Sequence, residues 1–71
     1  MEIEHKGYTI TPNSEQRPDG TWLPVAEIEF DDKGSVTTVP PLRAKAHEAR
    51  STREEADEAA CRMARDWIDA R

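Results

Sequence analysis

The chain has 71 residues and carries 15 acidic against 10 basic side chains, for a net charge of −5. This length accommodates one small domain, residues 1–71, near the lower limit for folding alone. The acidic balance disfavours non-specific binding to nucleic acid or anionic lipid, and no segment approaches the roughly 20 apolar residues of a membrane span. The start, MEIEHKGY, lacks a signal-peptide core, and Cys61 is the single cysteine, so we expect a cytoplasmic protein without a membrane segment.

Residues 3–12 predict the first strand, because large side chains of one parity alternate there with threonines. The large side chains are Tyr8, Ile10 and Pro12. Ile3 has the opposite parity, which we interpret as a bulge at Gly7 that resets the alternation. The chain then becomes polar up to Pro18-Asp19-Gly20, a tripeptide that favours a tight turn because Pro presets φ and Gly accepts positive φ.

Residues 22–30 predict the central strand, whose even-numbered positions form the more apolar face. These positions are Trp22, Pro24, Ala26, Ile28 and Phe30. A reversal at the preceding Pro-Asp-Gly places Tyr8 opposite Phe30 and Ile10 opposite Ile28. Because both pairs then share one face, the parity supports a hairpin between the first two strands.

A second turn at Asp31-Asp32-Lys33-Gly34 leads into a shorter third strand over residues 36–39, which we expect Pro40-Pro41 to end. Residues 42–50 stay open between two predictions. Their composition favours a short helical turn. The alternation of small and apolar side chains favours instead an extended or irregular connection that continues the edge strand opposite Trp22. The alternating residues are Leu42, Ala44 and Ala46.

Residues 53–70 predict one long amphipathic helix and are the most strongly periodic part of the chain. Thr52 is the expected N-cap, and Glu55 completes a capping box three residues later. We expect Trp67 to lie in the core, and Cys61 to be partly buried at the margin of the apolar face. That face is formed by residues at three- and four-residue spacing: Ala56, Ala59, Ala60, Met63, Ala64 and Trp67.

These elements predict an α+β fold of order β-β-β-α. A three-stranded antiparallel meander sheet over about residues 3–43 is followed by the long C-terminal helix, packed across one face. One helix covers only one face, so apolar side chains are predicted on the other: Leu23, Val25 and either Val36 or Val39. Pairing of these faces, or of the exposed sheet edges, predicts a homodimer.

No catalytic residue, metal site or cofactor is predicted, and we expect no enzyme activity. The soft metal ligands His5, His47 and Cys61 do not stand at a metal-site spacing. The candidate partner-binding residues combine an aromatic of the central strand with the cations of a basic stretch over residues 43–53: Trp22, Arg43, Lys45, Arg50 and Arg53. This stretch either neutralises the acidic start of the helix or docks an acidic partner or a nucleic-acid backbone.

The segment Thr52-Arg53-Glu54-Glu55-Ala56, after strands with an aromatic in the central one, resembles two families. The arm-type DNA-binding domains of phage integrases enter their helix through a similar Thr-x-x-Glu-Ala sequence, which implies a sheet that binds DNA. The N-terminal domains of HicB-type antitoxins open their helix with a similar Thr-x-Glu-Glu-Ala run, which implies a basic toxin as partner. The ending Trp67-Ile68-Asp69 is also similar to that of short uncharacterised bacterial β-β-β-α proteins.

The sequence therefore favours a non-catalytic interaction or regulatory module of the bacterial cytoplasm, which binds another protein or itself. The alternative is a nucleic-acid-binding domain that uses the basic stretch over residues 43–53. The net charge of −5 disfavours this alternative, because it repels the phosphate backbone at long range.

Overall fold

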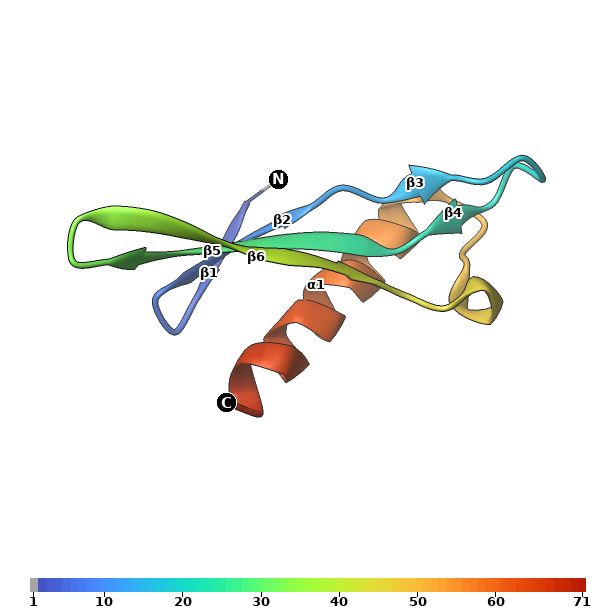
Figure 1. Ribbon diagram of the computed structural model, residues 1–71. Coiled ribbons are helices and arrows are strands. Elements are labelled where there is room, and N and C mark those ends of the chain that lie inside the picture. The colour runs from blue at the N-terminus through green and yellow to red at the C-terminus, as the bar shows by residue number, and fades with distance from the viewer. Residues whose placement is uncertain (1) are drawn as a thin grey trace.

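Residues 2–71 form a four-stranded antiparallel sheet with one α-helix across one face in the computed structural model of the chain (Figure 1). The strands of this sheet, in spatial order, are β1 (Ile3–His5), β2 (Tyr8–Pro12), β5 (Val25–Asp32) and β6 (Ser35–Arg43). The other elements are a two-stranded ribbon of β3 (Glu15–Gln16) and β4 (Trp22–Leu23), the 3₁₀ helix η1 (Ala46–Glu48) and the helix α1 (Arg53–Asp69). The predicted α+β class is confirmed. The three-stranded meander is wrong, because the main sheet has a fourth strand.

The additional strand arises near the N-terminus, where the segment predicted as one bulged strand forms the β1–β2 hairpin. Lys6 and Gly7 have φ angles of 50° and 84° and make the two-residue turn of this hairpin. Gly7 is therefore a turn residue and not a bulge. Ile3 pairs directly with Ile10 and shares its face, because the reversal of chain direction restarts the alternation.

Strands β2 and β5 form the central hairpin that the sequence predicts. Tyr8 pairs with Phe30 and Ile10 pairs with Ile28, so the predicted register is confirmed. The ribbon of β3 and β4 extends this hairpin toward its turn. Buried Pro24 separates β4 from β5, and the predicted strand over residues 22–30 is divided there because proline has no N–H for a sheet ladder.

Strand β6 continues through Pro40-Pro41, so the prediction that these prolines end the strand is wrong. The register shifts between Ala26 and Ile28, which leaves the two prolines opposite Glu27 in a bulge. Among residues 2–71, β6 is an edge strand with a neighbour on one side only. Proline is tolerated at bulges and edges, because its missing N–H then removes no ladder hydrogen bond.

Both predictions for residues 42–50 hold in part. The strand continues to Arg43, and the 3₁₀ helix over Ala46–Glu48 follows. Arg50 then lies beside Trp22, with backbone N–H to C=O distances of 2.8 Å in both directions. The connector is thus closed against β4 immediately before Thr52, which caps α1.

The core lies between α1 and the centre of the sheet. The hydroxyl of Thr52 accepts a hydrogen bond from the Glu55 N–H at 3.2 Å, which starts the helix where the sequence predicts. Small side chains allow a close approach to the sheet, where Ile10 and Ile28 are fully buried. The buried helix residues are Ala56, Ala60, Cys61, Ala64 and Ile68.

Trp67 packs at the margin of this core and not at its centre. It is half-buried and stands edge-on to Tyr8, with ring centroids 6.3 Å apart. Cys61, expected at the margin, is only 4% exposed and belongs to the core. The buried face of α1 is therefore rotated toward Cys61 and Ile68 relative to the predicted one.

The sheet face opposite α1 is polar and acidic. Strand pairing aligns residues of this face in one row across the four described strands: Glu4, Thr9, Glu29 and Thr38. Among residues 2–71, neither Glu4 nor Glu29 forms an ion pair within 4.0 Å. Val39 packs on the helix side and Val25 is 3% exposed, so neither forms the apolar patch predicted for this face. Val36, the alternative to Val39 in that prediction, does lie on this face and is 68% exposed.

Candidate functional site

The five predicted partner-binding residues lie at one end of the molecule, where β4, the end of β6 and the connector before α1 meet (Figure 1). Trp22 is half-buried in β4, and its backbone pairs with that of Arg50. The guanidinium of Arg53 lies 5.7 Å from the centre of the Trp22 ring, within cation–π range. Trp22 therefore supports the start of α1 and keeps part of its ring exposed.

Two cations of the basic stretch are compensated within the domain. Arg43 forms an ion pair with Glu15 of β3, and Arg53 lies 3.7 Å from the carboxylate of Asp57, one turn along α1. Two others have no such partner within 4.0 Å among residues 2–71: Lys45 and Arg50. This end of the molecule therefore presents two uncompensated cations instead of the four that the sequence indicates.

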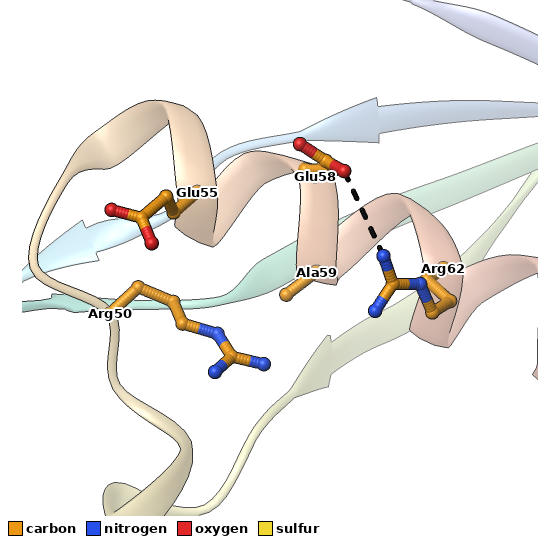
Figure 2. A pocket seen from close by; sticks show the side chains of 5 residues that line it. All are labelled: Arg50, Glu55, Glu58, Ala59 and Arg62. Atoms are coloured by element: carbon orange, nitrogen blue, oxygen red, sulfur yellow. Dashed lines mark ion pairs between the residues drawn. The ribbon is translucent and has the colours of Figure 1, made fainter.

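A pocket of about 170 Å³ opens between the connector and α1, and Figure 2 shows the side chains that line it. Arg50 and Arg62 reach into it from the two elements, on either side of Ala59. Glu58 lies 3.7 Å from Arg62, and the Glu55 carboxylate accepts hydrogen bonds from two hydroxyls at the start of α1, each at 3.0 Å. Two cations thus face two carboxylates, and the pocket has no net charge to attract an ion.

Displaced pKa values occur outside this pocket. Hydrogen bonds from Thr21 lower the pKa of the Asp19 carboxyl in the turn between β3 and β4. Burial raises the pKa of the Cys61 thiol, which favours the protonated and less reactive form.

Residues 2–71 contain no cluster of three His, Cys, Asp or Glu side chains that could hold a metal ion. No helix of the same range is long and apolar enough to cross a membrane.

Asp69, at the end of α1, contacts the turn between β1 and β2. One oxygen of its carboxylate lies 2.8 Å from Lys6 Nζ and 2.8 Å from His5 Nε2. Hydrogen bonding to Lys6, and secondly to His5, lowers the pKa of Asp69. This exposed contact fastens the β1–β2 turn to the helix.

The free edge of β6 is a further candidate surface, because no strand of the described residues 2–71 pairs with its outer side. Lys33-Gly34 has φ angles of 54° and 85° and forms the two-residue turn of the β5–β6 hairpin. The Asp32–Ser35 pair that closes such a turn is hydrogen-bonded, and hydrogen-bonded and non-hydrogen-bonded pairs alternate beyond it. The N–H and C=O groups of Val36 and Thr38 therefore point away from β5.

This part of the β6 edge is also exposed and uncharged. Residues 35–42 include no ionisable side chain, and Val36 is 68% exposed, which is unusual for a large aliphatic residue of this domain. The β5–β6 hairpin projects beyond α1, which leaves the edge uncovered (Figure 1). Pro40, at the next outward position, has no N–H. The β6 edge, defined here as residues 35–39, thus offers a free donor and a free acceptor at both Val36 and Thr38.

A family model described as Domain of unknown function (DUF6566) matches residues 1–71. The chain belongs to this family. No curated protein and no solved structure matches it significantly. The match extends over the sheet, the connector and the helix, so the DUF6566 domain includes both the basic end and the β6 edge.

Sequence reasoning located the basic end of the DUF6566 domain by residue, but the β6 edge only in general terms. The signal was nevertheless present. Lys33-Gly34 is a two-residue turn that sets which backbone groups face outward, and residues 36–39 are a β-branched run without charge. The pocket of Figure 2 had no sequence signal, because it depends on where Arg50 returns to β4.

Proposed function

We propose that this DUF6566 domain is a non-catalytic interaction module that binds an extended polypeptide segment, from another protein or a second copy, along the β6 edge. The observation that carries the proposal is the pair of outward-facing residues, Val36 and Thr38, on an exposed and uncharged strand. A strand added to a sheet edge gains main-chain hydrogen bonds and needs no groove. Natural sheets protect free edges with charge, proline or bulges, and β6 has its prolines and its bulge only beyond Val39.

The test uses peptides of about ten residues selected on the domain from a random display library, followed by amide hydrogen exchange of the domain with and without a selected peptide. We expect protection of the Val36 and Thr38 amides, at protein concentrations where the free domain is monomeric. The amide of Glu4, at the opposite edge, is the internal control and should not change. Thr38→Pro removes the outward N–H donor of this residue and should weaken binding of the selected peptide. Selected peptides that protect other amides instead, or a library without enriched peptides, would contradict the proposal.

Nucleic-acid binding through Trp22 and the basic stretch over residues 43–53 is the second candidate. The partly exposed Trp22 supports it, as does the lack of an ion pair within 4.0 Å for Lys45 and Arg50 among residues 2–71. The ion pairs of Arg43 and Arg53 with carboxylates, and the acidic open face of the sheet, disfavour it. Intramolecular compensation leaves fewer cations to replace the counterions of a phosphate backbone.

A salt titration with labelled duplex and single-stranded oligonucleotides separates the two candidates. We expect no measurable duplex binding at about 0.15 M salt, because the net charge of −5 repels the polymer and screening weakens the local cations. Binding through all four cations would instead be sub-micromolar and give a slope of log K against log salt of about −3 to −4. Arg43→Ala with Lys45→Ala would then flatten the slope by about two units.

The family resemblances stay predictions of the sequence. The likeness of the helix entry to HicB-type antitoxin domains agrees with a polypeptide partner, and the likeness to arm-type integrase domains agrees with the second candidate. A bacterial and cytoplasmic location is part of the proposal. Cys61 supports the cytoplasmic part of this proposal, because a single, buried, protonated thiol suits a reducing compartment.

A further inference from the structure

We infer that the segment bound along the β6 edge is the β6 strand of a second copy of this chain, in an antiparallel pair centred on Thr37. The inference rests on the proposed function, because it uses the same edge and names its partner. A two-fold axis through the Thr37 pair would join the two sheets into one continuous sheet, with both helices on the same face. The projection of the β5–β6 hairpin beyond α1 leaves room for this pairing (Figure 1).

The backbone of β6 selects this register. With Thr37 on the axis, Val36 of one copy lies opposite the partner's Thr38, and every outward N–H and C=O of both residues is paired. A register centred on Thr38 would place Val36 opposite the partner's Pro40, which has no N–H. A register centred on Val36 would place Thr38 opposite the partner's Gly34, which belongs to the turn. The register centred on Thr37 is therefore the one that leaves none of these groups unpaired.

The side chains suit the same register. Val36, 68% exposed in the single chain, would lie beside the partner's Thr38 on the open face of the sheet. No ionisable residue lies within residues 35–42, so no like charges oppose each other along the strands. The nearest carboxylates are Glu29 and Asp31 of β5. Across the dimer these would be three strand spacings apart, about 14 Å, which exceeds the screening length of about 8 Å at physiological salt.

Disulfide trapping tests the register directly. Thr37→Cys, in a Cys61→Ala background, places two thiols across the axis at a non-hydrogen-bonded pair, where Cα atoms are about 4.5 Å apart and a disulfide can form. Ser35→Cys in the same background is the matched control, because its two copies would be about 13 Å apart along the strands. We expect the Thr37→Cys dimer to form about tenfold faster or more. Equal rates for the two variants, or no dimer from Thr37→Cys, would overturn the inference.

Sedimentation equilibrium of the unmodified chain is the second measurement. We expect a mass that rises from 8.1 kDa toward twice that value with concentration. The dimer fraction should increase with salt, because screening reduces the repulsion between two chains of net charge −5. Thr37→Lys sets like charges across the axis and should weaken association about fivefold or more, with an unchanged circular dichroism spectrum, since Thr37 is exposed.

A chain that stays at 8.1 kDa up to about 1 mM, or a dimer that Thr37→Lys does not weaken, would overturn the inference. Neither result would decide the proposed function. The selected peptides report on the β6 edge of the monomer, through protection of the Val36 and Thr38 amides. A monomeric chain whose β6 edge still binds peptides would therefore refute the second copy as partner and keep the interaction module.

Discussion

The two outer hairpins of the sheet, β1–β2 and β5–β6, have the same turn but different edges. Lys6-Gly7 and Lys33-Gly34 have φ angles within a few degrees of each other. In both hairpins the backbone groups of every second residue, counted from the turn, therefore point outward from the sheet edge. On β1 the first outward residue is Glu4, in a strand of three residues. On β6 the outward residues are Val36 and Thr38, in a strand of nine residues.

The difference shows that an open edge is a local property of the sequence and not a consequence of the fold. A strand added at β1 would find few backbone groups and would meet the carboxylate of Glu4 beside them. The β1–β2 turn is also fastened to α1 through Asp69, whereas Lys33 of the other turn forms no ion pair within 4.0 Å among residues 2–71. The β1 edge is protected from strand addition by its short strand, by the charge of Glu4 and by the contact of its turn with Asp69. The β6 edge has no such protection over residues 35–39.

The largest expected effect comes from the residue on which both hairpins depend. Ile28 is fully buried on β5 and pairs with Ile10 on one side and Val39 on the other. Ile28→Ala should lower the free energy of unfolding by about 3–4 kcal/mol, through lost burial and the cavity left behind. Urea denaturation followed by circular dichroism measures it, with Val36→Ala as the exposed control expected within about 0.5 kcal/mol of the parent. Equal stability of the two variants would contradict the core described here.

A smaller effect is expected at Trp67 and should separate the two hairpins. Trp67 joins α1 to β2 through Tyr8, so Trp67→Ala should cost about 2 kcal/mol, below the range for a fully buried Trp because the residue is partly exposed. Hydrogen exchange should accelerate more in β1–β2 than in β5–β6. Arg71→Ala removes only the cation–π contact at 4.5 Å and is the control. An unchanged melting curve for Trp67→Ala would show that the ring does not hold the helix.

Much of the fold follows from local sequence signals. The Thr52 cap, the pairing of Ile10 with Ile28 and the apolar stripe of α1 all depend on short-range chemistry and on parity, and they were predictable. The fourth strand was missed because a Lys-Gly pair supports a turn as readily as a bulge when the strands beside it are short. The passage of β6 through Pro40-Pro41 was missed because it depends on the register shift between Ala26 and Ile28, which places both prolines opposite Glu27 and is set by strand pairing.

The candidate site was predictable only in part, for a related reason. The cations of residues 43–53 were apparent in the sequence, but their partners were not. Arg43 meets Glu15 because β3 folds back beside β4, which brings together residues 28 positions apart. Counting charges along residues 43–53 therefore overestimated the number of cations that this end of the molecule leaves without an ion pair. The ion pair of Arg53 with Asp57 was not predicted either, although the two residues are one helical turn apart and their spacing allows it.

The smallest expected effect tests the contact of Asp69 with Lys6 and His5, which the β1–β2 turn has and the β5–β6 turn lacks. The pKa of Asp69 lies below its ordinary value of 3.8 because Lys6, and secondly His5, bond its carboxylate. A carboxyl whose pKa is lower in the folded than in the unfolded state stabilises the fold above its unfolded pKa. It loses that contribution as the pH falls through the folded pKa, here below 3.8. Because the group is exposed, we expect a measurable titration shift and little change in stability near neutral pH.

Lys6→Asn removes the ammonium and keeps a residue that tolerates positive φ, so the turn should persist while the pKa of Asp69 rises toward 3.8. Lys33→Asn makes the same change in the other Lys-Gly turn, which has no contact with Asp69, and should leave that pKa where it was. Carboxyl carbon chemical shifts followed by NMR over the acidic range measure both variants. If the two substitutions move Asp69 equally, the shift reflects overall charge and not the contact at 2.8 Å, and the β1–β2 turn is no better fastened than the β5–β6 turn.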